Sequence, residues 1–261
     1  MSASAADAQT IAHPKSFLMA SSAAHMTPQE RTSSFSLASI FALRMFGLFI
    51  ILPVFAVYAR ELPGGDSETL VGITLGIYGL TQGLLQIPFG VASDRLGRKP
   101  VIIFGLIIFA LGSFLAASGA NIWIVMLGRM LQGAGAISAA VTAFIADSVR
   151  VQVLTKAMAM VGASIGLTFA LSLLISPPLT KLWGVSGLFT LTGISALIAV
   201  LVVKFVVPPA PQSAIDEKNE HRSWRKVVCD PQLVRLNIGI FVLHAVLTAI
   251  FVVIPTRLVY M

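Results

Sequence analysis

Long apolar runs separated by short polar segments make up most of this chain after its first thirty or so residues. A transmembrane β-strand would be about ten residues long and would alternate polar with apolar positions, and these runs do neither. Each run can cross about 30 Å of hydrocarbon as a helix, whose backbone groups bond one another where lipid offers no partner. The seven predicted spans are roughly Phe35–Tyr58, Leu70–Ala92, Pro100–Ser118, Ile122–Ala146, Ala157–Leu179, Val185–Val207 and Leu236–Ile254.

The polar segments divide the chain into four predicted parts. Residues 1–32 are rich in Ser and Ala and lack the apolar core of a signal peptide, so we expect a disordered tail. Residues 33–207 predict a six-span bundle, and residues 208–235, which begin with a proline-rich stretch and then carry many charges, predict a linker. Residues 236–261 predict a seventh span. The predicted fold class is therefore an all-α membrane protein.

The composition excludes several classes of protein. Of the 261 residues, 56% are hydrophobic and only 11% are charged, against about 25% charged in ordinary soluble domains. We therefore expect neither a soluble enzyme, nor a nucleic-acid-binding domain, nor a disordered chain. The single cysteine, Cys229, excludes a disulfide scaffold and a cysteine-ligated metal site. The spans hold no paired carboxylates and no nucleophile–base pair, so we predict no enzymatic activity, no metal and no cofactor.

The net charge of +7 is distributed unevenly between alternate loops. If the N-terminus is inside, twelve of the 18 lysines and arginines lie on the inner side of the membrane and only three on the outer side. Cytoplasmic loops of membrane proteins carry such an excess of Lys and Arg. We therefore expect the N-terminus and the linker to be cytoplasmic.

The loop between the second and third predicted spans carries a dense charged motif. Gly90 is expected to permit the close approach of another helix, and Asp94 lies one turn later on the same face. Gly97 suits a left-handed turn after a helix, and Pro100 suits a helix start. The cations of the loop favour the cytoplasmic side. The motif reads Gly90-Val-Ala-Ser-Asp94-Arg95-Leu-Gly97-Arg98-Lys99-Pro100.

This motif resembles the signature G-x-x-x-D-R-x-G-R-[KR] that the major facilitator superfamily carries between spans two and three. A second likeness lies in span four, where Arg129, Gln132 and Gly133 match the R-x-x-Q-G-x-G-A element of proton-linked members. The glycine-rich span-five motif of antiporters is only partly present. The chain is also similar to the YajR-like branch of bacterial drug–proton antiporters, through the strings Leu43-Arg44-Met45, Gly76-Ile77-Tyr78-Gly79-Leu80-Thr81-Gln82 and Arg235-Leu236-Asn237.

The resemblance implies roles for the residues of the loop. In that branch the aspartate and the second arginine form a charge relay with an acid at the end of span four, so the expected relay is Asp94, Arg98 and Asp147. The aspartate also meets the C-terminal half in one state of transport. The alternative is a static ion-pair cluster, which by itself contributes little. The expected conformational motif comprises Gly90, Asp94, Arg95, Gly97, Arg98, Lys99 and Asp147.

Several polar side chains are predicted to lie inside the membrane. Arg44 and Arg129 lie near mid-span, where an arginine costs roughly 2.5–3.5 kcal/mol, so each should face a cavity or a partner. Three partners are possible: a substrate anion, a helix C-terminus and an absent second half of the protein. Gln82 and Gln86 either line a water-filled cavity or form an interhelical hydrogen bond. His244 either titrates near neutral pH or is a packing residue. The candidates for proton coupling or cavity lining are Arg44, Gln82, Gln86, Arg129, Gln132 and His244.

The resemblance implies secondary active transport, with proton-coupled efflux of small organic compounds as the expected reaction. One alternative is uptake of a metabolite or an anion, motivated by the two arginines without an acidic partner. The alternative from another class is a non-transporting membrane fragment or a receptor-like protein. Members of the superfamily usually have two six-span halves, so we expect this chain to lack its C-terminal half. The expected partners are the lipid bilayer of a bacterial inner membrane, a small-molecule substrate and the proton, with no nucleic acid.

Overall fold

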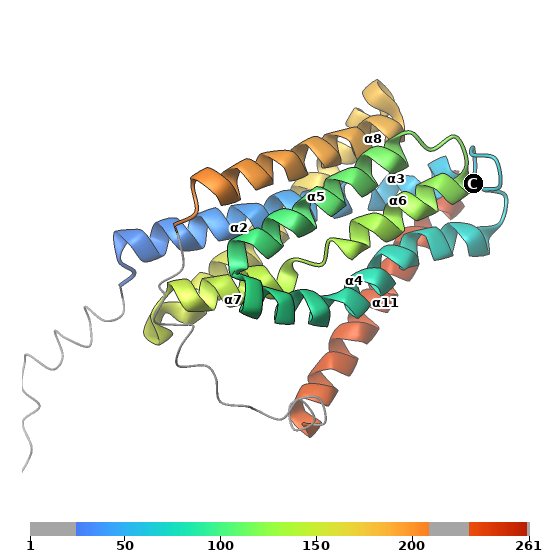
Figure 1. Ribbon diagram of the computed structural model, residues 1–261. Helices are drawn as coiled ribbons and strands as arrows, with labels where there is room; N and C mark the ends of the chain where they lie inside the picture. Colours follow the sequence, from blue (N-terminus) through green and yellow to red (C-terminus); the bar gives the residue numbers. More distant parts are fainter. Residues whose placement is uncertain (1–24, 209–229, 260–261) are drawn as a thin grey trace, which may run out of the picture.

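The computed structural model describes residues 25–208 and 230–259, and helices are the only regular elements within them (Figure 1). This confirms the predicted all-α class. The helices are α2 (Pro28–Phe49), α3 (Leu52–Ala59), α4 (Glu68–Leu96), α5 (Arg98–Ala117), α6 (Ile122–Ala134), α7 (Ser138–Ser148), α8 (Val151–Phe205) and α11 (Pro231–Val259).

The helices match the predicted spans, although not one to one. Span one is α2 followed by α3, span four is α6 followed by α7, and α8 contains spans five and six. Within the described residues, five helical segments are long and apolar enough to cross a membrane, since α8 counts as one of them. Part of α11, Val234–Ile250, is a shorter apolar stretch at the position of the predicted seventh span.

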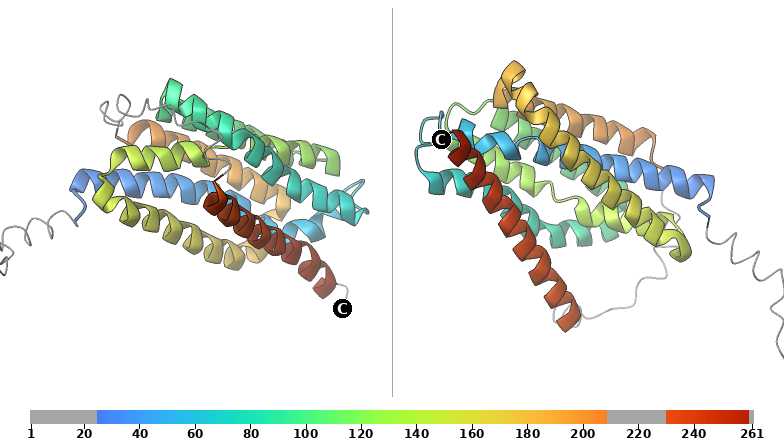
Figure 2. Two further views of the ribbon diagram at one scale, coloured as in Figure 1. Left: turned by 90° about the horizontal axis from the view of Figure 1, so that it is seen from below. Right: turned by 180° about the vertical axis from the view of Figure 1, so that it is seen from behind.

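The helix α8 is a hairpin of two helices. Its backbone is non-helical at Gly184, with φ 67° and ψ 176°. Residues that carry a Cβ rarely adopt this backbone conformation. Val153 near its start and Val203 near its end belong to the same core cluster. The chain therefore turns back at Gly184, as the yellow and orange stretches of α8 show in Figure 2.

Two predicted boundaries need correction. The first helix begins at Pro28 and not after residue 32, because Thr27 and Glu30 form a capping box in which each side chain accepts a hydrogen bond from the other's backbone N–H. The last helix begins at Pro231, inside the predicted linker 208–235, where Asp230 Oδ1 accepts a hydrogen bond from Gln232 N. The disorder predicted for the tail and the nature of the linker concern residues 1–24 and 209–229, outside the described residues.

The bundle has an apolar core cluster toward each end. We call one end the motif end, because α4 and α5 meet there at the signature loop, and α2 begins and α7 gives way to α8 on the same side (Figure 1). The cluster nearer the motif end joins α2, α5, α7 and both arms of α8. The other joins α3 with the starts of α4 and α6 and the second arm of α8. Packing at both ends makes the six spans one body.

Spans one and four are interrupted in their middle. Between α2 and α3 the N–H of Val54 bonds Ile51 O instead of the Ile50 carbonyl that a continuous helix would use. Ile50 O instead accepts a hydrogen bond of 2.5 Å from Ser176 Oγ of α8. An unsatisfied carbonyl in hydrocarbon would cost several kcal/mol, so a helix break at this depth needs such a neighbour. At the break in span four, between α6 and α7, the neighbouring side chain is charged.

Candidate functional site

At the motif end, Arg98 joins the ends of three helices. It is the first residue of α5, and its Nε donates to Asp147 Oδ2 in the last turn of α7 over 2.9 Å. Its Nη1 lies 2.7 Å from Ser93 Oγ and 2.5 Å from Asp94 Oδ1, both near the end of α4. The structure therefore brings Asp94, Arg98 and Asp147 together. We call these three residues the motif-end cluster.

The two acids of the motif-end cluster differ in exposure. The side chain of Asp147 is 6% exposed and lies inside the bundle with Arg98, whereas that of Asp94 is 63% exposed. A partly buried charge-assisted hydrogen bond is stronger than one between exposed groups. The Arg98–Asp147 pair is therefore the fixed side of the cluster, and the Asp94 carboxylate is its open side.

Three further residues of the expected conformational motif lie in the loop around the motif-end cluster. Gly97 adopts φ 92° between α4 and α5, a conformation that favours glycine. Lys99 Nζ donates to the carbonyl of Val207, just after the end of α8. Arg95 is exposed. The signature loop thus connects the end of α8 to α4 and α5.

Gly90 was expected to permit the close approach of another helix, and within the described part of the chain no helix comes that close to it. A Cβ placed at this position would lie 3.6 Å from Ala139 Cβ of α7, which is an ordinary van der Waals distance. The neighbouring helix therefore does not come close enough to require glycine here.

In the middle of the bundle, Arg44 of α2 bridges the break in span four. Its guanidinium is buried and donates to Gly135 O over 3.3 Å and to Ser138 Oγ over 3.0 Å. Gly135 is the residue at which α6 ends, and Ser138 begins α7. A cation at a helix C-terminus is favourable because of the helix dipole. Of the three partners that were open for Arg44, the structure provides the helix C-terminus.

Arg129 of α6 is buried beside polar and aromatic groups. Its Nη1 donates to Gln132 Oε1 over 3.0 Å, and Gln132 Nε2 donates to Ser113 Oγ of α5 over 2.8 Å. The Arg129 guanidinium carbon lies 4.7 Å from the centre of the Tyr78 ring of α4, within cation–π range. These contacts join α4, α5 and α6 at one point.

Among the described residues, no carboxylate forms an ion pair with Arg44 or Arg129. Both guanidinium groups are closed inside the bundle, although each leaves its Nε without a hydrogen-bond partner there. A side chain that faced a second half of the protein would be exposed in this one. Of the two expected surroundings, a cavity or a partner, the structure gives both arginines internal partners.

The remaining candidates for proton coupling or cavity lining are Gln82, Gln86 and His244. Gln82 and Gln86 are half-buried on α4, and Gln86 Oε1 is buried without a hydrogen-bond partner in the described part of the chain. His244 belongs to α11, but its side chain lies outside the described residues. Among the described residues, no hydrogen bond joins Gln82 or Gln86 to Arg44 or Arg129.

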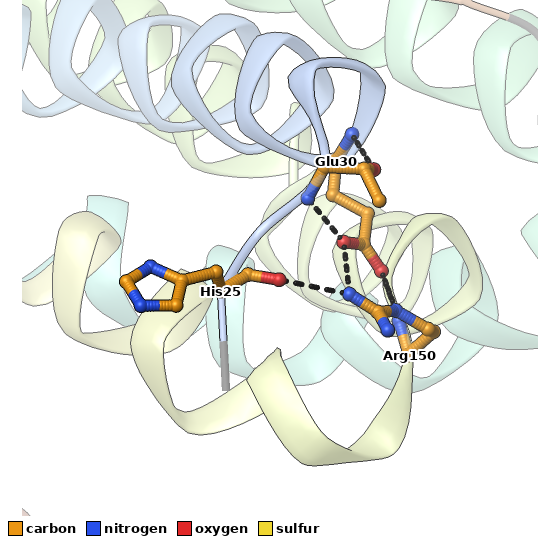
Figure 3. A network of polar contacts seen from close by, with 4 residues as sticks. His25, Glu30 and Arg150 are labelled. Atoms are coloured by element: carbon orange, nitrogen blue, oxygen red, sulfur yellow. Dashed lines mark hydrogen bonds and ion pairs between the residues drawn. The ribbon is translucent and has the colours of Figure 1, made fainter. Parts of the chain in front are cut away.

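Sequence reasoning missed an ion pair at the motif end, shown in Figure 3. Glu30, in the first turn of α2, binds Arg150 at the corner between α7 and α8, with Glu30 Oε1 2.8 Å from Arg150 Nε. The pattern Thr27-x-x-Glu30 directly before an apolar run indicates a capping box and would have located the helix start. No local pattern indicates the pairing with Arg150, because the two residues are far apart in the sequence.

A bundle of apolar spans that encloses its charges and carries a charged loop at one end defines a multi-pass membrane protein. The sequence profile of the Major Facilitator Superfamily matches residues 37–260. The chain belongs to this superfamily.

Three known proteins illustrate the relationship. The inner membrane transport protein YajR of Escherichia coli (strain K12) is 45% identical over 235 residues, which are 89% of this chain and 52% of that protein. The class B tetracycline resistance protein of Escherichia coli is 35% identical over 127 residues, 48% of this chain and 32% of that protein. A crystal structure of a bacterial homologue of the human lysosomal transporter Spinster, inward-facing and occupied, has a TM-score of 0.64 at 15% identity over 74% of this chain and 48% of that one, and so shares the fold.

The chain spans about half the length of the curated relatives it matches. The described residues comprise the six spans formed by α2 to α8 and the helix α11.

Proposed function

We propose that this chain is the first half of a secondary active transporter that moves small organic compounds out of the cell in exchange for protons. The protein lies in the bacterial inner membrane, with the motif end and the N-terminus in the cytoplasm. Membership of the superfamily, the similarity to an inner membrane transport protein and the excess of Lys and Arg on one side support this placement. The partial similarity to a tetracycline resistance protein supports efflux of a drug-like compound.

The observation that carries the proposal is the open side of the motif-end cluster. Alternating access requires two halves that rock against each other around a central site. Asp94 is held by Arg98 on one side and is 63% exposed on the other, so its carboxylate is available to a helix end of the second half. When the halves separate at this end, Asp94 loses that contact and keeps Arg98. The cluster then stabilises one of the two states more than the other, as a conformational switch must.

Protons supply the energy in this proposal. Moving one charge down the membrane potential yields about 2.3 kcal/mol per 100 mV. Arg129 cannot release a proton near neutral pH, so its contribution is to bias the protonation of a neighbouring group through its charge. The alternative of anion uptake is less supported, because Arg44 and Arg129 have internal partners.

The test is transport by the protein expressed at the full length of its reading frame and reconstituted in vesicles. With tetracycline and ethidium as probes, an imposed proton gradient should drive saturable movement against the direction of proton flow. Asp94→Asn should reduce the rate at least tenfold. Glu68→Gln, which removes an exposed acid paired with Arg60 at the other end of the bundle, should leave the rate within twofold. Probe movement in the direction of the protons, or an unaffected Asp94→Asn variant, would contradict the proposal.

A further inference from the structure

The Glu30 carboxylate holds the corner at which α7 gives way to α8. Its Oε1 accepts hydrogen bonds from the backbone N and from Nε of Arg150 over 3.0 and 2.8 Å. Its Oε2 accepts from Arg150 Nη2 over 3.1 Å and from the backbone N of Thr27 over 2.8 Å. Arg150 Nη2 also donates to the carbonyl of His25 over 2.9 Å, and Figure 3 shows these contacts around one buried carboxylate.

This corner is short and has no side-chain cap of its own. Val149 and Arg150 are its two residues, both with extended backbone, and Arg150 is the N-cap of α8 without a capping hydrogen bond from its own side chain. The Glu30 carboxylate instead accepts a hydrogen bond from the N–H of Arg150 itself, directly before the first turn of α8. Asp147 lies in the last turn of α7, three residues before Arg150. A carboxylate that fixes the corner therefore also fixes the position from which Asp147 reaches Arg98.

The Glu30–Arg150 pair is built differently from a surface ion pair. Two guanidinium nitrogens meet two carboxylate oxygens, a geometry that adds direction to charge. The hydrogen bond to Glu30 raises the pKa of Arg150 above its ordinary value. In the Arg60–Glu68 pair at the other end, Arg60 Nη2 lies 2.6 Å from Glu68 Oε1, and the Glu68 side chain is 79% exposed. Exposed pairs of that kind contribute little.

We propose that Glu30 and Arg150 are positioning residues for the motif-end cluster. They hold the end of α7 so that Asp147 pairs with Arg98, and they thereby tie the start of span one to the signature loop through Arg150, Asp147 and Arg98. Glu30 acts through the corner, and no direct bond joins its carboxylate to Arg98 or Asp147 among the contacts of the described residues. This positioning role does not depend on the proposed function. An effect of Glu30 on transport would follow from it, and that consequence rests on the proposed function.

The test measures the Arg98–Asp147 interaction by a double-mutant cycle in thermal unfolding of the purified protein, at the full length of its reading frame. The cycle uses Arg98→Gln, Asp147→Asn and the double variant, first in the native background and then with Glu30→Gln. We expect the coupling between Arg98 and Asp147 to fall by at least half when Glu30→Gln is present. A loss of general stability alone would shift all four midpoints equally and leave the coupling unchanged.

The matched control is the same cycle with Glu68→Gln, which should preserve the coupling. If Glu30→Gln does not fold, Arg150→Lys serves instead, because it keeps the charge and removes the two-nitrogen geometry. An unchanged coupling in the Glu30→Gln or Arg150→Lys background would overturn the inference. Transport of tetracycline and ethidium is measured separately, and there Glu30→Gln should lower the maximal rate and leave KM within twofold. A reduced coupling in a protein that moves neither probe would support the positioning role and count against the proposed function.

Discussion

The two polar regions of this bundle balance their charges in different ways. In the middle, Arg44 and Arg129 are buried and contact a carbonyl, a hydroxyl, an amide and aromatic rings. No carboxylate within residues 25–208 and 230–259 pairs with either of them. At the motif end, Arg98 lies between two acids, one buried and one exposed. The guanidinium groups of Arg44 and Arg129 are buried and have no exposed face that could bind a new partner. In the motif-end cluster, the exposed Asp94 carboxylate can bind one. We conclude that the first region holds the helices together and that the second is able to respond to a moving partner.

The largest effect is expected for Arg44→Ala, which tests whether the enclosed region is structural. The change leaves a cavity and removes the donors to Gly135 O and Ser138 Oγ at the break in span four. We expect the free energy of unfolding to fall by about 2–4 kcal/mol, after allowing for relief of the buried charge. Equilibrium unfolding in mixed micelles measures this. Arg44→Met fills the volume without the hydrogen bonds and should lose about half as much, and a loss below about 1 kcal/mol for Arg44→Ala would show that the break needs no charged neighbour.

An intermediate effect is expected where α6 packs on α4, next to Gln132. A Cβ at Gly133 would overlap the carbonyl of Tyr78 and the hydroxyl of Thr81, whereas a Cβ at Gly79, on the same α4, meets nothing within 4 Å. Gly133→Ala should therefore destabilise the protein by about 1–3 kcal/mol through overpacking, and Gly79→Ala should not. Thermal unfolding of the two variants side by side is the measurement. Equal midpoints would mean that α6 moves away from α4 without cost.

At the motif-end cluster the effects on stability should differ between the two acids, and the smallest effect of all is expected for Asp94. Asp147→Asn removes the buried partner of Arg98 and should cost about 1–3 kcal/mol. Asp94→Asn removes an exposed partner and should cost less than about 1 kcal/mol, with a further decrease in high salt. Unfolding at low and high ionic strength separates the two. If Asp94→Asn were the more destabilising change, the exposed acid would be a structural residue and not a responsive one.

Local patterns predicted some features of this bundle and failed for others. The apolar runs located the spans because a membrane-crossing helix must be apolar along about 30 Å. Gly97 was expected at a turn and lies at one, with a positive φ. The start of α2 was placed too late, since the apolar run begins after the cap formed by Thr27 and Glu30. The pairing of Glu30 with Arg150 was not predicted, because it joins the first turn of α2 to the corner between α7 and α8, which only the packed bundle brings together.

The sequence by itself determined that the chain is helical, that it crosses a membrane several times and that it resembles one superfamily, because hydrophobic length and a dense loop motif are local properties. Only the tertiary structure decided which partners the buried charges have. Arg44 was open to a substrate, to a helix end or to an absent half, and the break in span four supplies the helix end. A buried charge must be compensated by whatever groups packing brings within hydrogen-bond distance, and those groups come from distant parts of the chain.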